Sequence, residues 1–454
     1  VVCSVFPVYS TLISVMKVES LSLLGLLSTA SAAPQPRSVY IKDQQFIHAA
    51  SGEPIVLSGP NVVVKGPPYL PEVKGDTFCV DNTKDGCADT GTCTSCTTFN
   101  QADVDHIKSM GWNSIRLGVM WAGAQPEDVD SLDPDFLRRL HEVLDLTDKN
   151  NLYVVLDNHG DMVGSAGCGN GVPMWFSKQA SPDLIGQPLQ TGLPYSIIPS
   201  LNIENLDGYD TCGSDREKWA QYAGDPNYNL LNECCQAMNS PNPGAIGYTT
   251  IGQAGMDYMV LEGPGRDKFV RYWKLMAEAV VDHPSAIASE LMNEPMTLRR
   301  TAMFDTWRAA GEAIISVIPD MSVAVCGIGE GPLTPAPITE HNSDFLISDD
   351  TMDWMKASSN LFYAWHWYGT PKSTDKAVAN MQAIGEAWNM PTYLTEFMDC
   401  NAWNSAQNAN ISISYWHYSA YCTTGPAFGN RSVPDETFGA CILGWDGGDS
   451  SKIC

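Results

Sequence analysis

The chain has 454 residues, of which 44% are hydrophobic and 17% charged, and it carries a formal net charge of −26 with an isoelectric point of about 4.5. This composition is typical of a globular protein with ample core material. The negative charge argues against nucleic acid as a partner and against adsorption to anionic membranes, because both surfaces would repel it.

The first 32 residues are interpreted as upstream sequence followed by a secretory signal. Met16-Lys17 gives a basic start, residues 21–27 form a short apolar segment, and an Ala-x-Ala exit precedes Ala33. This order is that of a signal peptide, and we expect cleavage after Ala32. The segment is too short to span a bilayer, and no later stretch is long and apolar enough. We therefore expect a secreted protein without a membrane span, with residues 33–454 forming a single domain.

The oligomeric state expected from the sequence is a monomer, and the 14 cysteines point to disulfides. Cys3 falls within the leader, which leaves 13, and secretion favours disulfide formation. Cys93-x-x-Cys96 could be taken for a zinc knuckle, but neither a second such pair nor a histidine pair lies near it, so we favour disulfides. Cys326 ends an apolar run and is expected to be the odd, buried thiol. We expect no metal and no cofactor.

Eight apolar segments alternate with helical patterns along the chain. A small N-terminal β-ribbon at 39–41 and 46–47, with a turn at Ser51-Gly52, is expected to close the bottom of a barrel. The expected helices are 99–110, 137–146, 266–281, 306–318 and 376–388. The expected strands are 59–65, 113–117, 152–157, 286–292, 322–325, 361–365, 392–395 and 411–415. This order predicts an α/β fold, a (β/α)8 TIM barrel.

Two segments depart from a plain barrel. Residues 158–265 separate the third strand from its helix, which is far longer than an ordinary loop. We interpret this insertion as a disulfide-braced lid or wall of a substrate cleft. The alternative is a surface insertion without a functional role. Its cysteines are Cys168, Cys212, Cys234 and Cys235. Residues 425–454, rich in glycine and cysteine, are interpreted as a stapled C-terminal tail. Of the two glycosylation sequons, Asn430 is favoured over Asn410, because Asn410 opens a core strand.

Two glutamates end apolar strands about a hundred residues apart. Leu291-Met292-Asn293-Glu294-Pro295 closes one strand, and its proline places Glu294 at a rim rather than in a core. The apolar run 391–397 likewise places Glu396 at the end of a strand. Two carboxylates facing one pocket suit the cleavage of a glycosidic bond by acid catalysis and nucleophilic attack. The alternative is that each is a surface glutamate beside a strand.

Other strand ends supply polar partners for these glutamates. Arg116 ends the second strand, and a cation there would keep a nucleophilic carboxylate ionised. His159 follows the third strand, and His366 and Tyr368 follow the sixth. A lone histidine is more often structural, but two at equivalent rim positions favour a site.

Two further side chains could contact a sugar. Asn293 precedes Glu294 and could donate a hydrogen bond to a sugar 2-hydroxyl, a contact that strengthens in the transition state. Trp416 ends the eighth strand and could stack under a pyranose ring. Rows of aromatic residues are more often core, but a tryptophan at a strand end favours a platform.

This constellation resembles glycoside hydrolase family 5, the clan-A barrels that include cellulases, mannanases, exo-glucanases and endoglycoceramidases. The resemblance is carried by Asn293-Glu294-Pro295 and by the second strand-end glutamate. It implies that Glu294 is the acid/base and Glu396 the nucleophile. The residues that match the family's usual companions are Arg116, His159, Asn293, His366, Tyr368 and Trp416.

A finer resemblance is to the endoglycoceramidase branch. It is carried by residues 61–71 and by His159-Gly160-Asp161 followed by residues 171–175. It implies that Lys65 and Asp161 bind glucose. The long insertion departs from that branch.

The sequence therefore predicts a secreted, retaining β-glycoside hydrolase that acts on a β-linked carbohydrate or glycolipid. Retention requires the two carboxyl groups to lie about 5 Å apart, whereas inversion requires about 6.5–9.5 Å. A cellulase, other endo-β-glucanase or mannanase acting on polysaccharide is the first alternative. A non-catalytic carbohydrate-binding barrel is a remote one, and a structural cell-wall protein that uses the barrel as scaffold is another.

Overall fold

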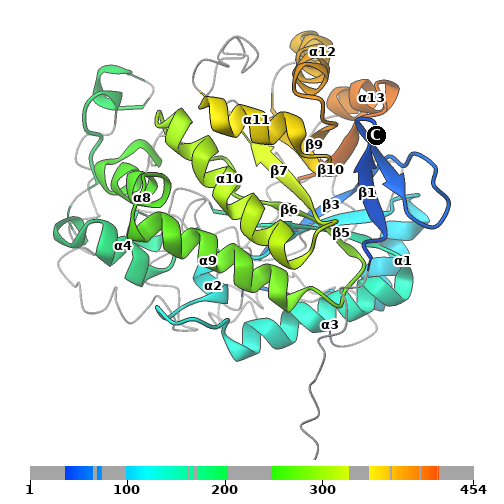
Figure 1. Cartoon of the computed structure of the whole chain (residues 1–454), viewed down its shortest axis with the longest axis horizontal. Helices are drawn as coiled ribbons and strands as arrows, with labels where there is room; N and C mark the ends of the chain where they lie inside the picture. Colours follow the sequence, from blue (N-terminus) through cyan, green and yellow to red (C-terminus); the bar gives the residue numbers. More distant parts are fainter. Residues whose placement is uncertain are drawn as a thin grey trace, which may run out of the picture. The chain divides into compact units, whose positions relative to one another are not determined.

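The residues described by the computed structural model form a closed barrel of eight parallel strands, which confirms the predicted (β/α)8 fold (Figure 1). All of them belong to the compact unit Pro34–Cys454. No helix among them is long and apolar enough to cross a membrane. The described residues are 36–64, 69–73, 99–160, 164–167, 171–185, 187, 189–199, 201–202, 247–326, 347–368, 371–397, 400–416 and 418.

The barrel strands follow one another around the barrel in chain order, and β10 closes it by pairing with both β9 and β3. Nearly every strand residue is buried, because side chains fill the barrel and helices cover it. That burial explains why the strands read as continuous apolar runs. The strands are β3 Ser58–Val62, β4 Ser114–Gly118, β5 Tyr153–Asp157, β6 Ala286–Glu290, β7 Ser322–Cys326, β8 Leu361–Trp367, β9 Thr392–Phe397 and β10 Ser412–Tyr415.

The boundaries of three strands differ from prediction in ways that affect the rim. β9 continues to Phe397 instead of ending at residue 395, so Glu396 lies within the strand. β8 continues to Trp367, so His366 lies within the strand and not after it. β6 ends at Glu290, so Glu294 lies on the loop that follows. These differences arise because apolar runs mark buried segments, whereas pairing decides where the strand ends.

Five helices correspond to predicted ones, with ends shifted by a few residues: α1 Gln101–Ser109, α3 Pro134–Asn150, α9 Pro264–Ala279, α10 Arg300–Val317 and α12 Pro371–Trp388. Local chemistry fixes two of their starts. Asn100 and Asp103 form a capping box at α1. Asp133 caps α3, whose first residue is Pro134. Five further α-helices within the described residues were not predicted: α2 Trp121–Ala124, α4 Met174–Ala180, α8 Thr250–Val260, α11 Asp349–Ala357 and α13 Cys400–Asn408.

The described parts of the insertion are folded against the barrel's helices. Helix α8 packs on α4, α9 and α10. Short 3-10 turns lie between α4 and α8 and just before α4: η2 Ser165–Gly167, η3 Pro182–Leu184 and η4 Tyr195–Ile197. The four cysteines of the insertion, the Cys93-x-x-Cys96 motif and the C-terminal tail lie outside the described residues, so their disulfides remain predictions.

The N-terminal ribbon is present, but its turn is not where the sequence placed it. Strands β1 Val39–Lys42 and β2 Gln45–His48 pair in antiparallel register. Asp43-Gln44 joins them, with φ of 50° and 60°, as a two-residue hairpin turn requires. Ser51-Gly52 instead follows β2. The ring of Phe46 packs edge-on against Phe362 and Tyr393 at the beginnings of β8 and β9, which places the ribbon at the N-terminal end of the barrel, as expected.

Cys326 is buried at the end of β7, as predicted, and its Sγ lies 3.1 Å from the carbonyl oxygen of Met292. A thiol can donate a hydrogen bond at that distance, whereas a disulfide sulfur cannot. The contact ties β7 to the loop that carries Glu294.

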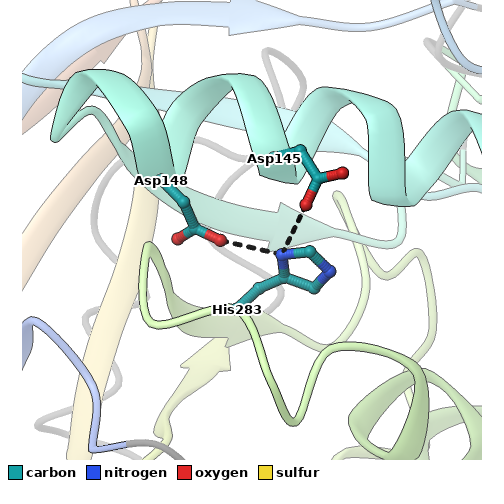
Figure 2. A group of neighbouring side chains, drawn as sticks. All are labelled: Asp145, Asp148 and His283. Atoms are coloured by element: carbon teal, nitrogen blue, oxygen red, sulfur yellow. Dashed lines mark hydrogen bonds and ion pairs between the residues drawn. The ribbon is translucent and has the colours of Figure 1, made fainter.

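At the N-terminal end of the barrel strands, two aspartates on α3 lie beside a histidine on the loop between α9 and β6 (Figure 2). The Nδ1 of His283 lies 2.8 Å from Asp148 Oδ2 and 3.8 Å from Asp145 Oδ1. The backbone N–H of Ser285 donates to the other oxygen of Asp148 at 2.8 Å. The ring nitrogen of His283 and one carboxylate oxygen of each aspartate are close enough together to bind a metal ion. Because both oxygens of Asp148 already accept hydrogen bonds, we interpret the group as a staple between α3 and the beginning of β6.

Asp148→Asn is expected to loosen this staple. Burial tends to raise the pKa of Asp148, but the hydrogen bonds from His283 and Ser285 prevail and lower it. A lowered carboxyl pKa stabilises the fold above the unfolded value near 4, and the stabilisation is lost as the pH falls through the folded value. We expect the variant to lose about 1 kcal/mol of unfolding free energy at pH 7, and the difference from wild type to shrink in acid.

Urea unfolding at pH 7 and at about pH 3.5 measures this difference. Asp145→Asn is the matched control on the same helix, because its carboxylate is more exposed and more distant from His283. Equal stability of wild type and Asp148→Asn at pH 7, or a difference that grows in acid, would contradict the prediction.

Candidate active site

The structure brings the two predicted glutamates together at the C-terminal end of the barrel strands. Glu396 lies near the end of β9 and is almost fully buried, whereas Glu294 lies on the loop after β6. One oxygen of each carboxylate and one ring nitrogen of His366 all lie within 4.8 Å of one another. This close approach of the two carboxylates suits a retaining mechanism, in which the carboxyl groups lie about 5–5.5 Å apart, better than an inverting one, in which they lie about 6.5–9.5 Å apart.

The backbone at Glu294 is in the left-handed region, with φ of 40°. Residues with a side chain rarely adopt this conformation, and it costs on the order of 1 kcal/mol or more unless the surroundings impose it. Here Asn293 is tied down, because its N–H donates to the carbonyl of Asn158 at 3.0 Å. Pro295 follows directly. The strained residue is thus held between fixed neighbours, which aims its carboxylate at Glu396.

Arg116, in β4, organises the floor of the site. Its Nε and Nη2 donate to the two oxygens of Glu290, each at 2.8 Å. Nη1 donates to Glu396 at 2.8 Å and to Asn61 at 2.7 Å, and Nη2 also donates to Asn293 at 2.9 Å. A guanidinium has five N–H groups, and these contacts use all five. The orientation of Arg116 is therefore fully determined.

The environment keeps Glu396 ionised. Burial alone would raise the pKa of Glu396, but the positive charges of His366, Arg116 and His159 lower it to about 2. The hydroxyl of Tyr368 adds to this effect by donating to Glu396 Oε2 at 2.7 Å. An ionised carboxylate is what nucleophilic attack requires.

His366 lies between the two glutamates. Its Nδ1 is 2.9 Å from Glu294 Oε1 and 3.5 Å from Glu396 Oε2. Burial lowers the pKa of His366, but the charge of Glu396 and the hydrogen bond with Glu294 raise it above its usual value. A raised pKa favours the protonated, positively charged form of His366, whose ring lies between the two carboxylates.

His159 forms the wall of the site together with Trp416. Its Nδ1 donates to Asp157 Oδ2 at 2.7 Å, because a carboxylate can only accept. Its ring stacks on the indole of Trp416, with centroids 4.8 Å apart and planes 11° from parallel. One face of Trp416 is thereby covered by His159. The opposite face is the one that could stack under a sugar.

The remaining predicted residues are placed only in part. Asn293 is buried, and its Oδ1 accepts from Arg116, so its amide nitrogen is the end that could donate to a sugar hydroxyl. Lys65 and Asp161 lie outside the described residues, and their contacts with glucose stay predictions.

Three buried residues of the site were missed by sequence reasoning: Glu290, Asp157 and Asn61. Asp157 and Glu290 are register partners on β5 and β6, and Asn61 is the register partner of Arg116 on β3. A signal was available, because charged residues inside apolar strands need buried partners of opposite charge. With a barrel predicted, neighbouring strands carrying Arg116, Asp157 and Glu290 could have been matched to one another.

Comparison with known proteins agrees with this geometry. The family description Cellulase (glycosyl hydrolase family 5) matches residues 80–187. Endoglycoceramidase I of Rhodococcus hoagii is 24% identical over 416 residues, which cover 88% of this chain and 73% of that protein. Endoglycoceramidase of Cyanea nozakii is 26% identical over 260 residues, which cover 57% of this chain and 41% of that protein.

Among solved structures, endogalactoceramidase superposes with a TM-score of 0.54 at 14% identity, covering 86% of this chain and 76% of that one. At this level of identity the likeness concerns the fold, and it agrees with the barrel described above.

Proposed function

We propose, on the premise that this chain is a glycoside hydrolase of the endoglycoceramidase-like branch of family 5, that it cleaves the β-glucosidic linkage between a sugar and an apolar aglycone. The observation that carries the proposal is the approach of Glu294 and Glu396 to within 4.8 Å across one space. That approach supports retention of configuration by double displacement.

In the first step, Glu396 attacks the anomeric carbon while Glu294 gives its proton to the departing oxygen. The glycosidic bond breaks, the aglycone leaves as an alcohol, and the sugar is held as an ester of Glu396. In the second step, Glu294 takes a proton from water, the water oxygen attacks the same carbon, and the ester bond breaks. Two displacements at one carbon return its original configuration.

The neighbouring charges suit this cycle. Arg116 and His366 keep Glu396 ionised before attack. Once the ester has formed, the negative charge of Glu396 is gone, and Glu294 no longer faces a like charge. Loss of that repulsion favours the ionised form of Glu294, which is the form needed to accept a proton from water.

An apolar aglycone is supported by exposed aliphatic side chains on the insertion and on the segment that follows the acid. Leu193 and Ile197, in the insertion, are 80% and 74% exposed, and Leu298, four residues after Glu294, is 60% exposed. The backbone N–H of Leu298 lies 3.3 Å from the hydroxyl of Tyr195, which joins the two segments. Glu294 protonates the leaving group, so its side of the site is where an aglycone would lie.

The first alternative is a polysaccharide substrate, and the name of the matching family description, Cellulase, favours it. A polymer-binding groove is commonly recognised by exposed tryptophans. Among the described residues, the large exposed hydrophobic side chains are aliphatic. We therefore favour a glycolipid over a polysaccharide.

A hydrolysis panel separates these substrates. Glucosylceramide in detergent micelles, cello-oligosaccharides, laminarin and mannan are compared at equal sugar concentration. We expect release of sugar from glucosylceramide with the highest kcat/KM, and proton NMR should show the β-anomer as the first product. Faster cleavage of any of the polysaccharides would overturn the aglycone assignment, and an α-anomer as first product would overturn retention.

We also propose that the chain is exported. The support is the basic Met16-Lys17, the short apolar segment and the Ala-x-Ala exit that precedes Ala33. N-terminal sequencing of protein collected from the culture medium should give Ala33 as the first residue. Retention of the chain inside the cell would contradict export.

Tyr368→Phe is expected to move the acid side of the activity profile. The variant loses the O–H donor at 2.7 Å from Glu396, and hydrogen bonds to a charged group contribute about 1.5–3 kcal/mol. The pKa of Glu396 should therefore rise by at least about one. A higher pKa means that Glu396 takes up a proton at higher pH, so kcat/KM should begin to fall at a higher pH than in wild type.

The measurement is kcat/KM on an aryl β-glucoside across the acid range. Tyr258→Phe is the control, because Tyr258 lies on α8 and its hydroxyl contacts Gln179 instead of the site. An acid limb in Tyr368→Phe that coincides with wild type would contradict the role of this hydroxyl.

A further inference from the structure

Glu290 is a fully buried carboxylate at the end of β6, and the mechanism above gives it no step. Both of its oxygens accept from Arg116 at 2.8 Å. Thr395 donates a longer hydrogen bond, of 3.3 Å, to Oε1. His366 Nε2 lies 3.9 Å from the same oxygen. Glu290 therefore lies behind Arg116 and His366, and does not border the space between the two glutamates.

A buried ion pair is weak evidence of stabilisation, because desolvation of both charges offsets their attraction. The geometry indicates a different use. Two parallel hydrogen bonds fix the plane of the guanidinium, because the Nε and Nη2 edge is held by Glu290. The Nη1 end is then turned toward Glu396 and Asn61.

Asn293 and Asp157 also contact Nη2 of Arg116, at 2.9 and 3.0 Å, whereas the single Nε hydrogen is held by Glu290. Without Glu290, Nε is no longer fixed, and the guanidinium could turn to pair with Glu396 through two hydrogen bonds. Such a pair would engage both oxygens of Glu396, whereas in the structure Arg116 contacts Oε1 and Tyr368 contacts Oε2. It would also shift the carboxylate from its position beside Glu294. A displacement of about 1 Å can cost a reaction on the order of 100-fold in rate.

We propose that Glu290 is a positioning residue of the catalytic site, which acts through Arg116 by limiting it to a single hydrogen bond with Glu396. The inference rests on the proposed hydrolase function. It predicts that the effect of Glu290 depends on the fork-shaped guanidinium of Arg116. A lysine at position 116 has no such fork, so Glu290 would have nothing to orient.

A double-mutant cycle tests this dependence. The variants Glu290→Gln, Arg116→Lys and their combination are assayed on a dinitrophenyl β-glucoside, whose leaving group departs without acid assistance, so that the first step reports on Glu396. We expect Glu290→Gln to lower kcat/KM, which reports on the first step, on the order of 100-fold with little change in KM. In the Arg116→Lys background, the same substitution should cost less than about threefold, because residues acting through one another are not additive.

Two outcomes overturn the inference: a wild-type kcat/KM in Glu290→Gln, or losses that multiply in the double variant. Asp148→Asn is the control for removing a partly buried, hydrogen-bonded carboxylate elsewhere in the barrel, and its kcat/KM should stay at the wild-type value. If Glu290→Gln does not fold, Glu290→Asp replaces it in the same cycle, because it keeps the charge but withdraws it by one methylene. A wild-type chain that hydrolyses no β-glycoside would overturn the proposed function and this inference with it.

Discussion

Glu396→Gln is expected to abolish turnover of every β-glucoside while leaving the barrel folded. An amide cannot form the ester on which double displacement depends, and loss of a nucleophile in other enzymes costs up to about 10⁶-fold in kcat. We expect a loss of at least about 10⁴-fold. The fold should persist because glutamine has the same shape, and its carbonyl oxygen can still accept from Arg116, which lies 2.8 Å from Glu396.

Two measurements check this expectation. Steady-state assays give the loss of kcat, and mass spectrometry of the protein treated with a fluorinated glucoside should show a sugar adduct on Glu396 in wild type and none in the variant. Glu386→Gln is the matched control, because Glu386 is exposed on α12 and undergoes the same chemical change. Turnover by Glu396→Gln close to wild type, or an adduct on another carboxylate, would remove Glu396 from its assigned role.

The pairing of the two glutamates could be predicted because both stand where an apolar run ends. In a parallel barrel, all strands present their carboxyl ends at one rim, so residues at that position converge however far apart they are in sequence. The fold class follows from the same runs. Neither inference needs knowledge of a side-chain contact, which explains why both could be made from sequence.

Glu290 could not be identified in this way. It lies inside the apolar run 286–292, where a single charged residue does not change the prediction of a buried strand. Its partner Arg116 is 174 positions away. The turn at Asp43-Gln44 escaped prediction for a related reason, because it lacks the glycine that usually marks a two-residue hairpin. The turn has no local sequence signal, whereas the pairing of Glu290 with Arg116 could be found only by comparing charged residues across neighbouring strands.

The acid/base role of Glu294 leads to a prediction that depends on the leaving group. Glu294→Ala should slow hydrolysis of glucosylceramide by about 10²–10⁴-fold, because its alkoxide leaving group needs a proton. A dinitrophenyl glucoside needs none, so formation of its ester on Glu396 should be nearly unaffected, and the ester should accumulate because no base activates water.

Azide requires no base, and the space left by the carboxylate would admit it. Added azide should therefore restore turnover and yield a β-glucosyl azide, which NMR identifies. Azide should not accelerate Glu386→Gln, which retains Glu294. Equal losses on both substrates, or an α-glucosyl azide, would show that the carboxylate 2.9 Å from His366 is not the proton donor.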